Sequence, residues 1–167
     1  TKSGTRIGHR NVFREHSSVH KATKEGTYTT IGDDSLFMVN SHVAHDCLVG
    51  NKVVLVNNAC LTGHTEMGDG AIMSAMTGIH QFCRIGRLAM MSALSGTNKD
   101  LPPFMTFGGR PAACLGLNLV GMRRAGIDRA KRSEIKQAYK WIYREGLLLN
   151  EALDRIEAEL KCAETKE

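Results

Sequence analysis

A six-residue repeat in the middle of the chain constrains the fold more than any other feature. Every sixth residue from Ile31 to Met91 is large and apolar. A second series, four positions beyond each of these, runs from Ser35 to Ser95 and contains only small residues. An α-helix turns every 3.6 residues, so it cannot keep a six-residue period on one face. The repeat predicts a coil of short strands, with large residues inward and small residues at tight corners.

A longer period indicates how many sides each coil has. Glycine recurs at every third repeat, at Gly32, Gly50, Gly68 and Gly86. Each coil is therefore expected to have three sides, and stacked coils pair edge to edge. This arrangement is a parallel β-helix.

The start of the chain keeps the six-residue spacing but interrupts the glycine period. Inward residues are expected at Ile7, Phe13 and Val19, with Asn11, Ser17 and Thr23 in the small series. Gly8 precedes Gly32 by four repeats rather than three. An additional stretch near residues 24–30 is therefore predicted to leave the coil as a loop.

The predicted β-helix occupies residues 1–100, and the repeat dissolves after Met91. Residues 101–127 are predicted to be an irregular connection, because prolines and adjacent glycines gather near its start. A helical extension is predicted over residues 128–167. Asp128 would cap a first helix that runs to about Glu145, and Asn150 would cap a second.

Composition limits the class of protein. Hydrophobic residues make up 42% of the chain and aromatic residues only 5%, so the core must be aliphatic. The formal net charge of +5 favours an acidic partner or a phosphorylated substrate, and no nucleic-acid partner is expected. The five cysteines include no C-x-x-C pair, which favours reduced thiols and a cytoplasmic location. No apolar run reaches the roughly 20 residues of a membrane span.

Four histidines, His42, His45, His64 and His80, lie within the repeat at positions other than the inward ones. The interval from His45 to His64 and the interval from His64 to His80 are both close to three repeats, the expected length of one coil. A strip of histidines is therefore predicted along one side of the prism. Spacing alone leaves three interpretations open: solvated surface imidazoles, a zinc site, or acid–base catalysis.

The local strings around these residues are more specific. They are NSHVAHDC at Asn40–Cys47, LTGH at Leu61–His64, TGIHQFC at Thr77–Cys83, GLNLVGMRR at Gly116–Arg124 and QAYKWIYR at Gln137–Arg144. Together they resemble the UDP-N-acetylglucosamine O-acyltransferases that begin lipid A synthesis. The resemblance covers nearly the whole chain, and it starts at the family's middle coils.

The resemblance implies a left-handed parallel β-helix of hexapeptide repeats that forms a homotrimer, with active sites between neighbouring prisms. It implies transfer of a 3-hydroxyacyl chain from acyl carrier protein to the 3-hydroxyl of UDP-N-acetylglucosamine. His45 matches the general base and Asp46 a residue that polarises it. The backbone N–H of Gly63 matches the donor to the oxyanion.

The resemblance also implies substrate contacts. The residues that match the sugar and nucleotide site are His42, His64, His80, Gln81, Asn118 and Arg124, the last as a contact to phosphate. Ala93 matches the ruler for acyl-chain length, and alanine there predicts a chain of medium length. No metal or cofactor is expected, because the phosphopantetheine thioester of the carrier protein is a co-substrate.

The chain departs from the family pattern in three respects. The family's N-terminal coils, which hold an Asp and a Lys implicated in substrate binding, have no counterpart here. Val120 stands in place of an acidic residue, and Ala125 in place of an arginine. Two alternatives therefore stay open: a non-catalytic or altered-substrate β-helix, and a zinc-dependent hydratase of the carbonic anhydrase type.

Overall fold

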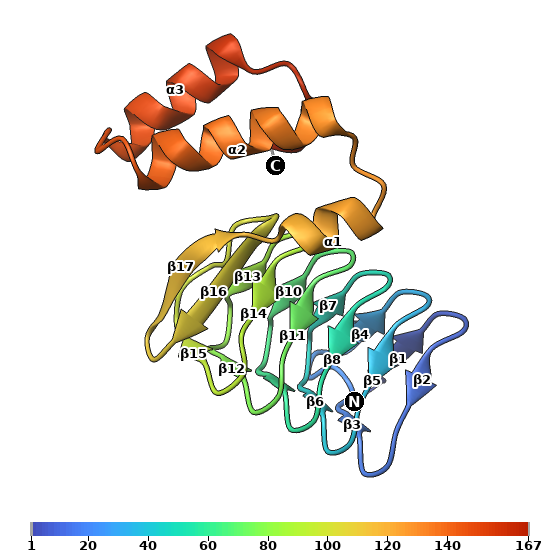
Figure 1. Cartoon of the computed structure of the whole chain (residues 1–167). Coiled ribbons are helices and arrows are strands. Elements are labelled where there is room, and N and C mark those ends of the chain that lie inside the picture. Colours follow the sequence, from blue (N-terminus) through green and yellow to red (C-terminus); the bar gives the residue numbers. More distant parts are fainter. Residues whose placement is uncertain (1, 167) are drawn as a thin grey trace. The chain divides into compact units, whose positions relative to one another are not determined.

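The computed structural model describes residues 2–166. The chain divides between Leu115 and Gly116 into two compact units. The first is a coil of short strands joined by parallel pairing, and the second is mainly helical (Figure 1). The predicted class, a parallel β-helix with a small helical extension, is confirmed.

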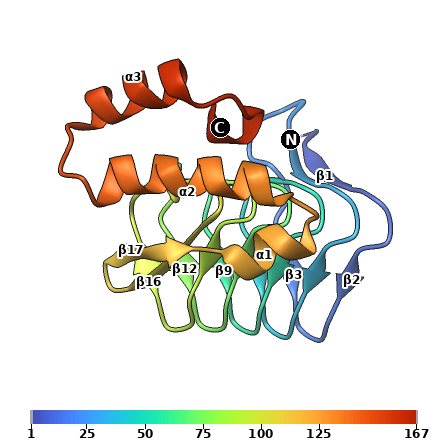
Figure 2. The ribbon, with the colours of Figure 1, turned by 45° about the horizontal axis from the view of Figure 1, so that its top comes forward.

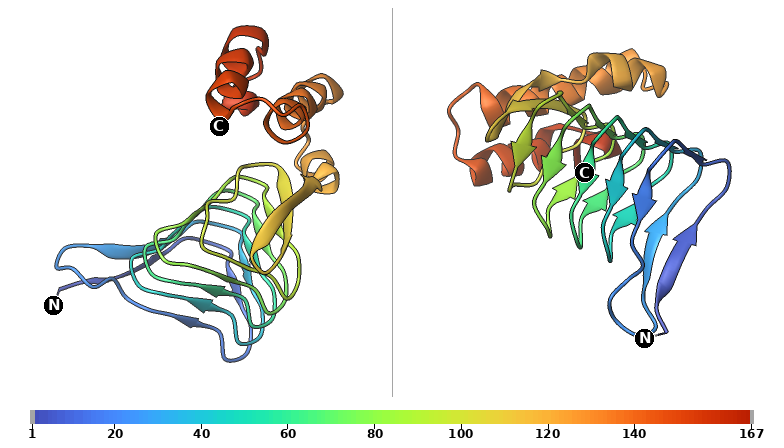
Figure 3. Two further views of the ribbon diagram at one scale, coloured as in Figure 1. Left: turned by 90° about the vertical axis from the view of Figure 1, so that its left-hand side faces the viewer. Right: turned by 90° about the horizontal axis from the view of Figure 1, so that it is seen from below.

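Three sheets form the sides of the coil. Sheet A contains, in spatial order, β1 (Gly4–Ile7), β4 (Tyr28–Ile31), β7 (Leu48–Val49), β10 (Glu66–Met67) and β13 (Arg84–Ile85). Sheet B contains β2 (Val12–Phe13), β5 (Leu36–Phe37), β8 (Val54–Leu55), β11 (Ile72–Met73), β14 (Met90–Met91), β16 (Met105–Gly109) and β17 (Ala112–Leu117). Sheet C contains β3 (Ser18–Val19), β6 (His42–Val43), β9 (Cys60–Leu61), β12 (Gly78–Ile79) and β15 (Gly96–Thr97). In the left view of Figure 3 these coils overlie one another in a three-sided outline.

The six-residue repeat forms the core. Every residue of the large series from Ile31 to Met91 is at most 4% exposed, and every residue of the small series from Ser35 to Ser95 at most 6%. Met73 pairs with Leu55 on one side and with Met91 on the other, which hold the same position in the adjacent coils. Identical phase in every coil thus stacks like residues into columns, which fill the interior at close packing.

The corners have a conformation that the sequence did not indicate. The second residue of each corner has a positive φ, as at Asp46 (60°), His64 (60°) and Phe82 (66°). L-residues adopt this conformation rarely. The amide of His64 donates to His45 O in the preceding coil at 3.1 Å, and that of Phe82 donates to Gly63 O at 3.1 Å, whereas the amide of Asp46 donates to the Thr29 hydroxyl. Corner side chains in the same phase of successive coils therefore project from one edge, one after another.

Close approach of successive coils explains the glycine period. A Cβ on Gly68 would lie 2.7 Å from the backbone nitrogen of Arg87, and one on Gly86 would lie 2.4 Å from that of Pro103. Both glycines directly follow a strand of sheet A, where the next coil passes close by. A larger side chain would push adjacent coils apart.

The first coil is longer than the others, and its structure corrects one prediction. β1 pairs with β4 at an offset of four repeats rather than three, with Gly4 opposite Tyr28. The turn is confined to the segment before Tyr28, where Thr27 N donates to Lys24 O. Residues 28–30 belong to β4, so the predicted loop over 24–30 is wrong for this half, because these residues extend sheet A (Figure 3).

The small series in this coil is also displaced. Thr29, which is fully buried, occupies the small position one coil before Cys47, whereas Thr23 is exposed. The expectation that Thr23 fills a corner is therefore wrong. At the end of the stack, Ile7 and Phe13 remain 46% and 39% exposed, and Phe13 stacks on Phe37 with ring centroids 4.7 Å apart.

Residues 101–127 are more regular than predicted. β16 continues sheet B beside β14, with Thr106 opposite Met90, and β17 lies beyond β16. A short helix, α1 (Leu119–Arg124), follows. The prediction of an irregular connection is wrong here, because pairing with an existing sheet edge supplies order that the lost repeat no longer signals.

The helical unit contains α2 (Arg129–Tyr143), α3 (Leu149–Glu159) and a 3-10 turn at Ala163–Lys166. Asp128 caps α2 as predicted, accepting from Lys131 N at 2.9 Å. The cap of α3 is Leu148 rather than Asn150, and the Leu148 amide donates to Glu151. Helices α2 and α3 lie side by side (Figure 2) around a cluster of Ala138, Trp141, Ala152 and Ile156.

All five cysteines are free. Over residues 2–166, no helix has both the length and the apolar character needed to cross a membrane.

Candidate active site

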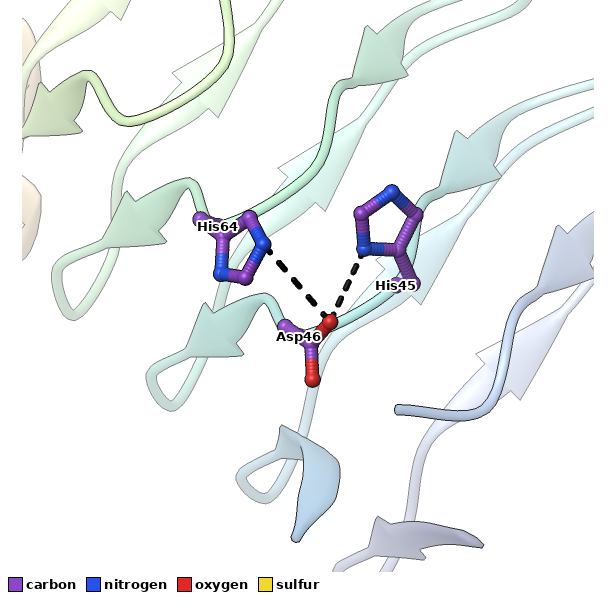
Figure 4. Close-up of side chains that lie close together, drawn as sticks. All are labelled: His45, Asp46 and His64. Atoms are coloured by element: carbon purple, nitrogen blue, oxygen red, sulfur yellow. Dashed lines mark hydrogen bonds and ion pairs between the residues drawn. The ribbon is translucent and has the colours of Figure 1, made fainter. Parts of the chain in front are cut away.

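His45 and Asp46 form the corner between β6 and β7, where sheet C meets sheet A. The Nδ1 atom of His45 lies 2.9 Å from Oδ2 of Asp46 (Figure 4). An ionised carboxylate only accepts hydrogen bonds, so Nδ1 of His45 must carry the proton. The second ring nitrogen, Nε2, points away from Asp46, and in the neutral ring with the proton on Nδ1 it is the nitrogen with the lone pair. This is the tautomer that a general base requires.

The Asp46 side chain is only 11% exposed and is surrounded by donors. Thr23 donates its hydroxyl to Oδ2 at 2.6 Å and its amide to Oδ1 at 3.1 Å. Burial raises the pKa of the Asp46 carboxyl, but the hydrogen bonds from Thr23 and His45 outweigh burial and lower it to about 2. Asp46 is therefore ionised at neutral pH.

His64 and Phe82 continue the column that starts at Asp46, each one coil further along. Nε2 of His64 lies 3.7 Å from Oδ2 of Asp46, and its ring stands edge-on to His45 at 5.2 Å between centroids. Phe82 is 66% exposed and stacks on His64 at 4.6 Å with planes 8° apart. Sequence reasoning found His64 but missed Phe82, although Phe82 follows His64 by one coil of three repeats.

Gly63 is the neighbour of His45 in the next coil. A Cβ on Gly63 would lie 2.6 Å from Cε1 of the His45 ring, so only glycine leaves space for this imidazole. The Gly63 amide makes no hydrogen bond with any other residue in the range 2–166. A residue with a free backbone donor thus packs against the His45 ring.

The remaining predicted histidines lie on sheet C or directly after it. His42, in β6, has its Nδ1 atom 2.9 Å from Ser18 Oγ. Burial is the main cause that lowers the pKa of His42, and nearby His20 lowers it further. His80 follows β12, and its Nδ1 atom lies 3.1 Å from the carbonyl oxygen of Gln81. The predicted strip is therefore present along sheet C and its corner, with His45 and His64 as the pair that shares Asp46.

His20 was not among the predicted site residues. Its ring packs edge-on against His42, with centroids 4.4 Å apart. Counting through the longer first coil would have given it the same phase as His80, because one long coil and two regular coils separate them. An open hollow of about 710 Å³ adjoins His20 and is lined by Thr5, Val19, His20, Lys21, Ala22, Thr23 and His45. Lys21 gives it a positive charge.

Three predicted residues lie elsewhere. Ala93 is exposed at the corner between β14 and β15, where sheet B meets sheet C, which is a different edge from that of His45. Asn118 belongs to the second unit, where its Oδ1 accepts from Gly121 N at 2.9 Å and caps α1. Arg124 ends α1, is exposed, and has no ion-pair partner among residues 2–166.

His45, Asp46 and His64 also offer three donor atoms of the kind that zinc binds, all within 4.8 Å of one another. Their present contacts differ from a ligand set. Nδ1 of His45 and Oδ2 of Asp46 are bonded to each other, and Thr23 already donates to the same oxygen. The group is arranged as a hydrogen-bonded dyad with an adjacent imidazole.

Comparison with known proteins identifies the family of the chain. The family described as UDP N-acetylglucosamine O-acyltransferase, domain 2, matches residues 100–167. A relative from Verminephrobacter eiseniae, named acyl-(acyl-carrier-protein)–UDP-N-acetylglucosamine O-acyltransferase, is 46% identical over 158 residues, which are 94% of this chain and 60% of the relative. The chain thus spans about 60% of the length of this relative.

Solved structures agree on the fold. The UDP-N-acetylglucosamine acyltransferase from Campylobacter jejuni superposes with a TM-score of 0.93 at 36% identity, covering 99% of this chain and 66% of that one. The corresponding enzyme from Bacteroides fragilis gives a TM-score of 0.84 at 30% identity, covering 98% of this chain and 76% of that one. The chain belongs to the UDP-N-acetylglucosamine O-acyltransferase family.

Proposed function

We propose that this chain transfers a 3-hydroxyacyl group from acyl carrier protein to the 3-hydroxyl of UDP-N-acetylglucosamine, the first step of lipid A biosynthesis. The observation that carries the proposal is the His45–Asp46 dyad beside the free amide of Gly63. Acyl transfer from a thioester needs these two elements: a base for the attacking hydroxyl and a donor for the developing oxyanion. The relatives' names supply the two substrates.

His45 acts first as base and then as acid. Its Nε2 atom takes the proton of the sugar 3-hydroxyl while the sugar oxygen bonds to the thioester carbon. The carbonyl oxygen becomes an oxyanion and accepts a hydrogen bond from Gly63 N–H. The tetrahedral intermediate collapses, the C–S bond breaks, and His45 returns the proton to the leaving thiolate. Asp46 holds the imidazolium that forms between these steps.

The side chains around the dyad are proposed to contact the substrates. His42, His64, His80 and Gln81 would face the sugar and nucleotide, and Lys21 in the hollow suits a diphosphate. Asn118 and Arg124 are proposed as further contacts to the nucleotide. Ala93 is proposed to limit acyl-chain length. The net charge of +5 complements both an acidic carrier protein and the nucleotide.

Assembly is part of the proposal. The histidines lie on an exposed side of the coil, and the hollow beside His45 is open. A homotrimer would wall each such side with a neighbouring chain, and three-fold symmetry would repeat the site three times. We propose a cytoplasmic location, because both proposed substrates, the carrier protein and the nucleotide sugar, are present in that compartment. Neither metal nor cofactor takes part.

Two alternatives remain to be tested. The donor set of His45, Asp46 and His64 favours zinc as the next candidate, which would make the chain a hydratase. Val120 in place of the family's acidic residue and Ala125 in place of its arginine favour a non-catalytic β-helix or one with an altered substrate.

One assay separates these functions. Transfer is measured with UDP-N-acetylglucosamine and 3-hydroxyacyl carrier protein on the wild-type chain, His45→Ala and His9→Ala. His9 is an exposed histidine of the first coil and serves as the matched control. The proposal expects the wild-type chain and His9→Ala to be equally active. His45→Ala is expected to lose activity by about 10²-fold or more. Equal activity in wild type and His45→Ala would refute the assigned base, and inactivity of all three would favour the two alternatives over acyl transfer.

A further inference from the structure

The first coil contains one repeat more than the others, and the added residues follow Thr23. The chain leaves the coil after Ala22, which is buried, and rejoins it at Thr29, which fills the small position. Thr23 therefore lies off the repeat, at the start of the excursion. Its position has no counterpart in the regular coils.

Thr23 faces the Asp46 carboxylate with both of its donors. Its hydroxyl donates to Oδ2 at 2.6 Å, and its amide donates to Oδ1 at 3.1 Å and to Oδ2 at 3.3 Å. Thr29, from the end of the same excursion, accepts from the Asp46 amide at 2.8 Å. The two ends of the excursion thus hold the backbone and the side chain of a single residue.

The orientation of this carboxylate decides which histidine it serves. Oδ2 lies 2.9 Å from Nδ1 of His45 and 3.7 Å from Nε2 of His64, so the two imidazoles flank one oxygen (Figure 4). Asp46 is a corner residue, and rotation about its Cβ–Cγ bond would change the distances from its oxygens to both imidazoles. The hydrogen bonds from Thr23, which engage both carboxylate oxygens, oppose that rotation.

We propose that Thr23 is a positioning residue for the His45–Asp46 dyad, and that the added residues of the first coil place it there. Thr23 holds the carboxylate on His45, and the carboxylate in turn holds the proton on Nδ1 so that Nε2 can act as base. The inference rests on the proposed function for its catalytic meaning. The geometric part, Thr23 acting on the tautomer of His45, can be measured without turnover.

The test compares Thr23→Val, which keeps the shape and removes the hydroxyl, with Thr23→Ser, which keeps the hydroxyl. Thr27→Val is the matched control, because the Thr27 hydroxyl donates to Lys24 O in the same turn and does not touch Asp46. ¹⁵N NMR of the histidine rings reports which nitrogen of His45 carries the proton. Turnover is measured at saturating and limiting UDP-N-acetylglucosamine.

We expect Thr23→Val to lose the Nδ1–H signature of His45 and to lower kcat by roughly 10- to 100-fold, with little change in KM, since partners that orient a functional histidine have effects of this size. Thr23→Ser and Thr27→Val should match wild type in both measurements. An unchanged tautomer in Thr23→Val overturns the inference. Should Thr23→Val melt early, Thr23→Ala provides a second variant without the hydroxyl, and the same tautomer criterion applies to it.

The two proposals fail in different ways. A wild-type chain with no transfer activity contradicts the proposed function, while the tautomer of His45 in Thr23→Val still decides the role of Thr23. An active wild type whose Thr23→Val variant keeps its kcat and its tautomer contradicts the role of Thr23 alone.

Discussion

A methyl group on Gly63 would lie 2.6 Å from Cε1 of the His45 ring in the preceding coil. This is closer than van der Waals contact allows, so the ring and the backbone of Gly63 are fitted to each other. The contact joins the proposed base to the proposed oxyanion donor. Any side chain at residue 63 would therefore disturb both at once.

Gly63→Ala is expected to lower acyl transfer by about 10²-fold or more, because the displaced imidazole and amide no longer meet one reacting centre. The measurement is kcat/KM with melting temperature alongside. Gly78→Ala is the control, since a Cβ there meets nothing within 4 Å. Retention of full activity in Gly63→Ala would show that the close contact has no catalytic consequence.

Asp46 should make stability depend on pH. Its pKa is about 2 in the folded chain against 3.8 for the unperturbed group, so the ionised form stabilises the fold above about pH 4 and this stabilisation is lost as pH falls toward 2. Wild type should exceed Asp46→Asn in unfolding free energy at pH 7 by an amount that shrinks by on the order of 1–2 kcal/mol at pH 2. Urea unfolding followed by circular dichroism checks this. A gap that stays constant between the two pH values contradicts it.

The inward column should dominate stability. Leu55 is fully buried, whereas Leu48, in the outward phase, is 50% exposed. Leu55→Ala is expected to cost about 2–5 kcal/mol, because it leaves a cavity between stacked coils. Leu48→Ala should cost less than about 1 kcal/mol. Similar urea midpoints for the two variants would contradict the assigned phase.

Ala93→Gly should shift the preferred donor toward longer acyl chains, because glycine opens space at the proposed end of the chain groove. The measurement is competition between carrier proteins loaded with 3-hydroxyacyl groups of different lengths. Ala75→Gly is the matched control, one coil earlier at the same corner position. If Ala93→Gly keeps the wild-type preference, residue 93 is not the ruler.

Removal of metal should leave transfer unchanged. The Nδ1 atom of His45 and Oδ2 of Asp46 are hydrogen-bonded to each other, so neither atom is free to bind an ion without breaking the dyad. Activity is compared before and after dialysis against a chelator, with metal content measured on the same samples. Loss of transfer that added zinc restores would contradict the metal-free mechanism and assign His45, Asp46 and His64 to a zinc ion.

Much of the fold was determined by the sequence alone. The large series from Ile31 to Met91 and the small series from Ser35 to Ser95 define an inward and a corner position in each repeat, and exposure is at most 6% at all of them. Such a strict period leaves one regular solution, so the coil could be predicted residue by residue from Ile31 to Met91. Prediction failed outside the regular period. Residues 28–30, 105–109 and 112–117 form strands because they pair with a neighbouring sheet edge, which no local pattern records.

For the site, the sequence determined which histidines share a side of the coil, since residues about three repeats apart lie on successive coils. Only the tertiary structure decided their partners. In the structure Thr23 donates a hydrogen bond to Asp46, and Asp46 lies closer to His45 than to His64. The Phe82 ring stacks on His64. These relationships depend on side-chain direction at the corners and on the excursion of the first coil, and a repeat fixes position along the coil without fixing where a side chain points.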